Sequence, residues 1–187
     1  NLVTGVQTCA LPICSASPPI NAVTGGGAGA RARGAWSQRA RGGRARAPPF
    51  VPPLPGIEEV GYVTSDTLWD EFAQLDCVPG RLVVLGGGPI GCELAQSFAR
   101  LGSQVTQVEM LPRIMIREDE DVSAYARKAL EADGVAVLTG HKALRCERRG
   151  EDKILVASTQ GQEVEIVFDA LVCAVGRVAR LKGYGLE

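Results

Sequence analysis

The chain has 187 residues, and its 20 basic and 21 acidic residues give a formal net charge of −1. This length fits one domain, or one domain with a short extension. Its 45% hydrophobic and 22% charged residues are ordinary for a globular protein. It has no run of about 18 apolar residues, which excludes a membrane-spanning helix, so we expect no membrane partner.

The cysteines and the single histidine favour neither a disulfide scaffold nor a metal site. The six Cys are irregularly spaced and include no C-x-x-C pair, so we predict free thiols and no metal site. Cys9 and Cys14 show a C-x4-C spacing but lack the flanking glycines and the helix pattern of a redox pair. Because no basic residue precedes the mildly apolar residues 6–13, we predict no signal peptide and a cytoplasmic location.

The first fifty residues differ from the rest. Residues 1–50 hold six Arg and no acid, hence +6, whereas residues 51–187 hold 14 basic and 21 acidic residues, hence −7. The Ala/Arg/Gly run at 28–47 has three interpretations: an RNA-binding tail, a disordered arm, or GC-rich DNA translated in a wrong frame. Residues 3–13 look like a translated sequencing adapter. We therefore predict that residues 1–50 are disordered or non-native and that the chain binds no nucleic acid.

Residues 51–80 are predicted to form a connector and a short helix. The prolines in 48–56 fix φ and lack amide donors, which argues against a central strand or a helix there. Residues 65–67 are suited to cap a helix. The apolar side chains of this predicted helix recur three to four residues apart. They are Leu68, Trp69, Phe72 and Leu75.

Residues 81–187 are predicted to form an NAD(P)-binding domain. The apolar run 81–85 favours a strand buried on both faces, as in a parallel sheet. A G-x-G-x-x-G pattern follows, and then a helix that ends at Gly102. The helix has one apolar face, made of Ile90, Leu94, Phe98 and Leu101. Residues 104–108 are predicted to form the second strand, with Glu109 at its end.

The glycine-rich turn suits a dinucleotide. Gly86 allows a tight turn, Gly88 lets backbone N–H groups approach a pyrophosphate, and Gly91 lets the helix pack closely on the sheet. Pro89 fits the first helical turn, where its missing N–H costs no bond. The helix N-terminus contributes roughly 0.3–1 kcal/mol toward an anion. An α/β domain with another ligand, such as a nucleotide sugar or a methyl donor, is the alternative.

Glu109 indicates which dinucleotide is preferred. It stands 18 residues after Gly91, near the spacing of about 20 for an acid that binds the adenosine ribose. Its carboxylate would repel the 2′-phosphate of NADP. We therefore predict NAD, with NADP less favoured unless Arg113 folds back toward the site.

The remaining pattern completes an α/β domain. The acidic run 118–121 opens a helix that ends at Asp133, and acids at a helix N-terminus are dipole-favoured, which weakens a metal-binding interpretation. Its apolar residues are Val122, Tyr125, Ala126, Ala129 and Leu130. Further strands are predicted at 135–138, 144–147, 153–157, 163–168 and 171–175. The middle three form a small antiparallel meander with turns at Gly150 and Gly161.

From about Pro52 onward the chain resembles the pyridine nucleotide-disulfide oxidoreductases, the family of dihydrolipoamide dehydrogenase and mercuric reductase. The matching strings are 55–56, 64–66, 84–93, 105–109 and 169–177. The resemblance implies a Rossmann-like FAD/NAD(P)-binding fold with a parallel sheet, helices and a small antiparallel meander. It also implies an oxidoreductase and flavoprotein in which NAD(P)H bound to this domain passes hydride to FAD.

The resemblance also implies site residues. Glu93 matches a Glu near the nicotinamide–flavin junction, and Gly176 and Arg177 match a segment beside the cofactor and the domain boundary. An exposed Glu93 favoured by the helix dipole and a surface Arg177 are the alternatives. We predict no catalytic residue in this chain. The predicted cofactor-binding residues are Gly86, Gly87, Gly88, Pro89, Ile90, Gly91, Glu93, Glu109, Gly176 and Arg177.

Several parts of the family pattern are not found in the sequence: the FAD fingerprint, the C-x4-C pair in a Gly-rich helix start, and the C-terminal dimerisation domain. His141 is predicted to be a solvated loop residue, and Cys92 and Cys173 small core residues. We therefore expect a fragment that is inactive alone, whose intact enzyme adds an FAD domain and a dimer partner. A self-standing NAD-binding sensory or regulatory module without redox activity is the alternative.

Overall fold

The computed structural model describes residues 47–179, all within the second of two compact units into which the chain divides, Ala45–Glu187. The predictions for the adapter-like segment, for most of the Ala/Arg/Gly run and for Cys9 and Cys14 lie outside the described residues. The predicted domain boundaries stay predictions. No helix within residues 47–179 is long and apolar enough to cross a membrane.

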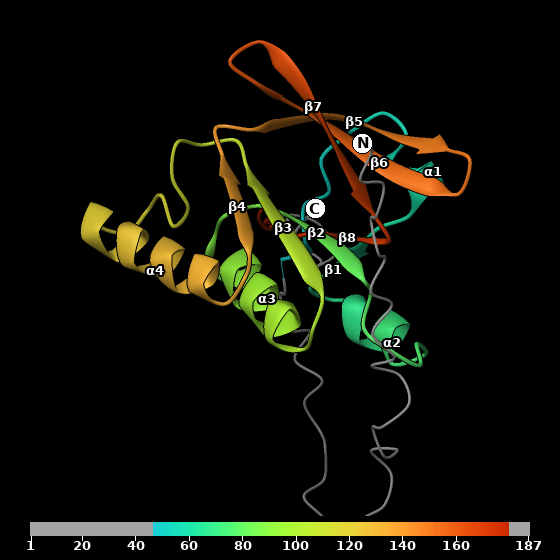
Figure 1. Ribbon diagram of the computed structural model, residues 1–187, viewed down its shortest axis with the longest axis horizontal. Coiled ribbons are helices and arrows are strands. Elements are labelled where there is room, and N and C mark those ends of the chain that lie inside the picture. Colours follow the sequence, from blue (N-terminus) through green and yellow to red (C-terminus); the bar gives the residue numbers. More distant parts are fainter. Residues whose placement is uncertain (1–46, 180–187) are drawn as a thin grey trace, which may run out of the picture. The chain divides into compact units, whose positions relative to one another are not determined.

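A five-stranded parallel sheet organises the domain, in the strand order β1-β8-β2-β3-β4 (Figure 1). Its strands are β1 (Val63–Thr64), β2 (Arg81–Leu85), β3 (Gln104–Glu109), β4 (Ala136–Thr139) and β8 (Ala170–Cys173). Helix α3 (Pro89–Arg100) connects β2 to β3, and α4 (Glu120–Ala132) connects β3 to β4. The predicted α/β fold is confirmed, and each predicted strand from residue 81 onward lies within two residues of its observed limits.

The central strand β2 is buried on both faces, as its apolar run predicted. Leu82 and Val84 belong to a core formed with α3 and α4. The alternate residues Val83 and Leu85 belong to a second core, formed with the antiparallel sheet and helix α1 (Ile57–Val60). The parallel sheet is therefore the middle of three layers, with α3 and α4 on one side and the antiparallel sheet and α1 on the other (Figure 1).

The predicted helical faces are only partly correct. In α3, Leu94 and Phe98 are buried, but Ile90 and Leu101 near its two ends are exposed. In α4, Leu130 is buried, but Val122 and Tyr125 are exposed, the latter by 78%. Periodicity identified the helices correctly. It could not show how far along each helix the sheet covers the apolar stripe.

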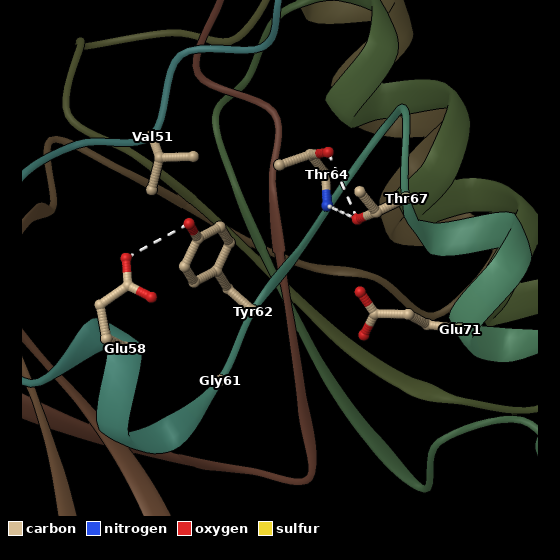
Figure 2. A pocket seen from close by; sticks show the side chains of 7 residues that line it. All are labelled: Val51, Glu58, Gly61, Tyr62, Thr64, Thr67 and Glu71. Carbon is tan, nitrogen blue, oxygen red and sulfur yellow. Dashed lines mark hydrogen bonds between the residues drawn. The ribbon is translucent and has the colours of Figure 1, made fainter.

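The β1 edge contains two elements that the sequence pattern did not predict. Helix α1 follows the proline-rich connector, and β1 pairs in parallel with β8 over only two residues. Between β1 and α2 (Leu68–Phe72), the Thr64 amide donates to Thr67 Oγ1 at 3.0 Å (Figure 2). The predicted short helix is thus confirmed. Its Leu68 is buried, whereas Trp69 and Leu75 are exposed.

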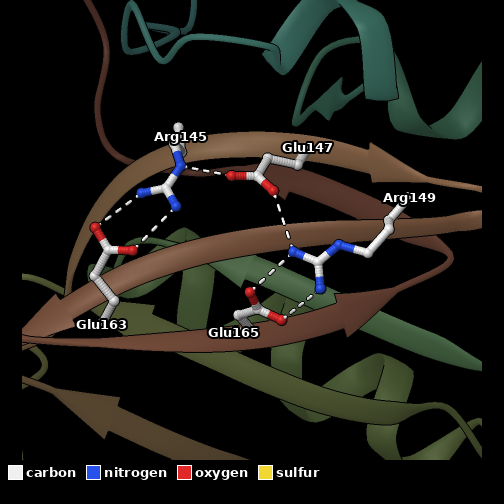
Figure 3. Close-up of polar contacts among 5 residues, drawn as sticks. All are labelled: Arg145, Glu147, Arg149, Glu163 and Glu165. Atoms are coloured by element: carbon white, nitrogen blue, oxygen red, sulfur yellow. Dashed lines mark hydrogen bonds and ion pairs between the residues drawn. The ribbon is translucent and has the colours of Figure 1, made fainter.

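The predicted meander is confirmed as a three-stranded sheet of β5 (Lys142–Arg149), β6 (Asp152–Thr159) and β7 (Gln162–Phe168). Ion pairs and hydrogen bonds join five side chains across its outer face (Figure 3): Arg145, Glu147, Arg149, Glu163 and Glu165. Beneath them, Ile154 and Val156 of β6 are buried although they belong to neither core. Exposed ion pairs contribute little by themselves, so the main effect of this network is to cover two apolar side chains.

One ion pair fixes the parallel sheet where the antiparallel sheet ends. Asp169, between β7 and β8, accepts the Arg81 backbone N–H at 2.7 Å and its guanidinium at 2.6 Å. These bonds, the guanidinium bond first, hold the pKa of Asp169 below its usual range. Asp169 is the first residue of the family-like string 169–177. Its bonds to Arg81 hold the start of β8 beside the start of β2.

We expect the Asp169→Asn chain to be less stable than the wild type at neutral pH, with the difference vanishing in acid. A carboxyl whose pKa is lowered by folding stabilises the protein above its unfolded pKa of about 3.9. That contribution disappears as pH falls through the lower, folded pKa. Urea midpoints measured across this range test the expectation, with the exposed Asp76→Asn as control. A difference that stays constant with pH would contradict it.

Candidate functional site

The predicted cofactor-binding residues of the glycine-rich turn and the first turn of α3, together with Glu109, meet at the carboxyl edge of the parallel sheet. Leu85 at the end of β2 pairs with Val108 of β3 on one side and with Cys173 of β8 on the other. Glu109 at the end of β3 pairs with Thr139 of β4. In open α/β sheets, ligands bind in the crevice outside this edge.

Gly86 and Gly91 bring the turn, the helix and the sheet into close contact. Gly86 has φ +107°, and a Cβ there would lie 2.5 Å from the Ala174 carbonyl oxygen. A Cβ on Gly91 would overlap the Gly86 carbonyl oxygen and lie 3.3 Å from Gln107 Nε2. Both positions therefore require glycine, Gly86 for the tight turn and Gly91 for the close packing of the helix that the sequence predicted.

Gly87 joins the glycine-rich turn to Glu109. Its amide donates to Glu109 Oε2 at 2.6 Å, and the Leu111 amide donates to Glu109 Oε1 at 2.8 Å. The Gly87 carbonyl accepts the Met115 amide at 2.7 Å. A Cβ on Gly87 would lie 2.8 Å from Ile114, which is buried. The segment after β3 thus packs on the turn, and the two backbone amides hold the carboxylate of Glu109 in one orientation.

The first turn of α3 is uncapped and open. Gly88 is its N-cap with extended backbone, no side chain caps the helix, and Pro89 occupies the first helical position. A Cβ on Gly88 would meet no atom within 4 Å. Ile90 and Glu93 are exposed. The first amides of a helix have no intrahelical acceptor, so this terminus presents donors and a partial positive charge to an anion.

Arg113 does not fold back toward Glu109. Its Nη1 donates to the carbonyl oxygens of Met115 and Glu118, at 3.2 and 2.9 Å. This cation therefore stabilises the loop between β3 and α4.

Gly176 and Arg177 follow β8 and come directly after Ala174 and Val175, which lie close to Gly86, and here the chain runs beside its own connector. Phe50 N–H donates to the Gly176 carbonyl, and Val178 N–H donates to the Pro48 carbonyl. The Arg177 guanidinium donates to the Ala47 carbonyl at 2.7 Å, to Ser65 Oγ at 3.2 Å and to Asp66 at 3.1 Å. No partner of Arg177 belongs to the glycine-rich turn. The role of both residues in cofactor binding stays a prediction.

Cys92, Cys146 and Cys173 are free thiols. Burial raises the pKa of Cys146 to about 11 and that of Cys173 to about 12, which fits the predicted core role of Cys173. Cys92 is half-buried, and burial raises its pKa too. His141 is more enclosed than a solvated loop residue, because its Nδ1 lies 2.8 Å from the Thr139 carbonyl oxygen.

Sequence reasoning missed Gln107 as a site residue. It lies in the middle of β3, is fully buried, and donates from Nε2 to the Gly86 carbonyl at 3.0 Å. A polar residue within a strand ordinarily faces solvent, so the pattern gave no sign that this one lies under the turn. Only the packing of α3 on β3 reveals it.

Two hollows lie away from the turn, along β1 and α2. One, of about 350 Å³, is lined by Val51, Glu58, Gly61, Tyr62, Thr64, Thr67 and Glu71 (Figure 2). Tyr62 donates to Glu58 Oε1 at 3.3 Å, and burial, followed by this carboxylate, raises the pKa of Tyr62. The other, of about 500 Å³, is lined by residues 61–63, by the end of α2 and the segment that follows it up to residue 80, by Lys153, and by residues 169–171. No metal-binding group of three side chains occurs among residues 47–179.

Comparison with known proteins gives matches over most of the chain. A sequence model of the pyridine nucleotide-disulphide oxidoreductases matches residues 40–187. A dihydrolipoyl dehydrogenase from Thermus scotoductus is 42% identical over 132 residues, covering 68% of this chain and 29% of that enzyme. A mercuric reductase from Lysinibacillus sphaericus is 36% identical over 131 residues, covering 70% and 23%. The chain thus spans less than a third of the length of these curated relatives.

Solved structures match as well. The HOCl-induced flavoprotein disulfide reductase RclA from Escherichia coli superposes with a TM-score of 0.61 at 32% identity, covering 71% of this chain and 29% of that one. A water-forming NADH oxidase from Lactobacillus brevis, solved bound to NADH, shares the fold with a TM-score of 0.58 at 22% identity. It covers 70% of this chain and 29% of that one.

Proposed function

Because the chain belongs to the pyridine nucleotide-disulphide oxidoreductase family, as its motifs predicted, we propose that residues 81–187 are the NAD(P)H-binding domain of an FAD-dependent member. The dinucleotide binds at the carboxyl edge, with its pyrophosphate on the turn Gly86–Gly91 and its adenosine ribose on Glu109. In the intact enzyme, the bound nicotinamide delivers hydride to FAD. Glu93, Gly176 and Arg177 complete the predicted cofactor contacts.

The observation that supports this proposal most directly is the join between the turn and the acid. The Gly87–Glu109 bond of 2.6 Å sets a carboxylate beside an uncapped helix N-terminus. The helix end attracts the phosphates, and the carboxylate accepts hydroxyl donors. These are the two polar groups that an adenosine diphosphate moiety presents. The residues present therefore fit the group.

FAD and its domain belong to the proposed intact enzyme, together with a dimer partner. FAD would accept a hydride, which carries two electrons, and this chain's residues would hold and orient the nicotinamide that donates it. Since the chain spans less than a third of its curated relatives, we propose that it is inactive as a reductase by itself. Free thiols at Cys92, Cys146 and Cys173 are compatible with a reducing, cytoplasmic location.

We expect the chain to bind NADH more tightly than NADPH, by about tenfold or more. The carboxylate of Glu109 repels a 2′-phosphate, and Arg113, bonded to Met115 and Glu118, does not offset that repulsion. Titration of the purified chain with each dinucleotide, followed by nicotinamide fluorescence, measures both dissociation constants. Tighter binding of NADPH would contradict the cofactor assignment, and no binding of either would contradict the proposed function.

The alternative of a self-standing sensory or regulatory module predicts the same binding but no coupling to flavin. Oxidation of NADH with and without added FAD, together with an absorbance scan for bound flavin, separates the two functions. The chain fused to the flavin domain of a relative provides the positive control. The family membership favours the redox role.

A further inference from the structure

Gln107 is an unusual residue at the centre of the parallel sheet. It is fully buried, and it pairs in register with Val84 of β2 and Val137 of β4. Burial of an amide side chain is unfavourable unless its donors and acceptors are hydrogen-bonded. An apolar side chain would fill this position more favourably if packing were its only task.

The side-chain NH₂ group of Gln107 donates a hydrogen bond to the glycine-rich turn from the sheet side. Nε2 donates to the Gly86 carbonyl oxygen at 3.0 Å and also contacts Cys92 Sγ at 3.5 Å. Gly91 covers the same carbonyl from the helix side, so closely that a Cβ would overlap it. No other described residue donates to this oxygen. Gln107 therefore ties the first glycine of the turn to the first turn of α3.

The side-chain oxygen of Gln107 has no corresponding hydrogen bond. Oε1 is buried and has no hydrogen-bond partner among the described residues. The side chain thus leaves one buried polar atom unpaired while it satisfies another. Unpaired buried groups in folded proteins call for a functional explanation, and the only element served here is the glycine-rich turn.

We propose that Gln107 is a positioning residue for the dinucleotide, which fixes the Gly86 carbonyl and the start of α3 so that the amides above meet the pyrophosphate in one orientation. The inference rests on the proposed function, because it takes the turn to be the dinucleotide site. Without Gln107, the Gly86 carbonyl loses its only hydrogen-bond donor among the described residues, and this peptide group is held only through the Gly87 N–H bond to Glu109. The amides that follow are then less firmly held in their common direction.

Three variants test this role. Gln107→Leu removes the donor and keeps the volume. Gln107→Glu restores a donor only while its carboxyl is protonated, and burial raises the pKa of such a carboxyl toward neutrality. Gln104→Glu is the matched control, because Gln104 lies on the same strand and is exposed. Val84 and Val137 bring no charge, and the nearby titratable groups Cys92, Glu93 and Glu109 are common to all the proteins compared.

We expect Gln107→Leu to bind NADH about tenfold more weakly than the wild type. Gln107→Glu should bind within about threefold of the wild type near pH 6 and at least about thirtyfold more weakly near pH 8.5. The wild type and Gln104→Glu should show little change over this range. Circular dichroism at each pH gives the folded fraction, so that affinity refers to folded protein only. A purely structural role would lower the folded fraction and leave that affinity unchanged.

Parallel pH profiles of Gln107→Glu and Gln104→Glu, or wild-type affinity in Gln107→Leu, would overturn the inference. Hydrogen exchange of the Gln107 side-chain amide, followed by NMR, separates this failure from that of the proposed function. A protected amide in a wild-type chain that binds no NADH contradicts the dinucleotide site. An amide that exchanges as fast as that of Gln104 contradicts the contact with Gly86.

Discussion

The Gly91→Ala chain is expected to lose about 3 kcal/mol of its free energy of unfolding and to lose NADH binding. The added Cβ would overlap the Gly86 carbonyl oxygen and lie 3.1 Å from its carbonyl carbon. Both are backbone atoms of a buried turn, so α3 must move away from the sheet. Overpacking of this kind costs typically 1–3 kcal/mol, and more where backbone has to shift. Urea unfolding followed by circular dichroism measures the change.

Gly88→Ala is the matched comparison, with the opposite pattern. Gly88 has φ −76° in extended backbone, and a Cβ there meets nothing within 4 Å. We expect a stability loss below about 1 kcal/mol but NADH binding weaker by about tenfold or more, because the methyl group occupies the space where the pyrophosphate approaches. A Gly91→Ala chain as stable as the wild type would contradict the close packing of α3 on the turn.

The Glu109→Gln chain is expected to bind NADH about tenfold or more weakly than the wild type. Each Glu109 oxygen accepts one backbone amide, from Gly87 and from Leu111. The oxygen of an amide side chain can accept only one of those donors, and its NH₂ group faces the other, so one backbone amide loses its acceptor. The loss of charge also removes the repulsion of a 2′-phosphate, so NADPH binding should weaken less than NADH binding.

Titration with both dinucleotides and a urea unfolding curve measure these effects together. Glu151→Gln makes the same chemical change on the exposed β5–β6 turn and serves as the control. An unchanged ratio of NADH to NADPH affinity would show that Glu109 does not select the cofactor. An unchanged unfolding midpoint would show that its two backbone bonds are dispensable.

Local patterns predicted most of the fold. The apolar run of β2, the glycine spacing and the periodicity of α3 are each encoded within a few consecutive residues, and all three appear as expected. Helix α1 and strand β1 are too short to show a period. Strand β1 is defined only by the pairing of Val63 and Thr64 with Val172 and Cys173, which are far away in the sequence.

The site was predictable to the same extent. The glycines and Glu109 follow a spacing that reflects their tasks, so the sequence alone indicates them. Gln107 has no such spacing, because its partner is the Gly86 backbone carbonyl. That carbonyl lies beside Gln107 only after β2, β3 and α3 have packed together. Likewise, Arg177 was placed near the domain boundary by resemblance, but its bonds to Ala47, Ser65 and Asp66 depend on the course of the connector.

The pairing of the connector with the segment after β8 has a consequence for modularity. Pro48 and Phe50 bond to Val178 and Gly176, so the path into the domain and the path out of it run side by side. A domain whose two ends meet can be inserted into a loop of another protein without stretching the host. The hydrogen bonds of Arg177 hold these two segments together.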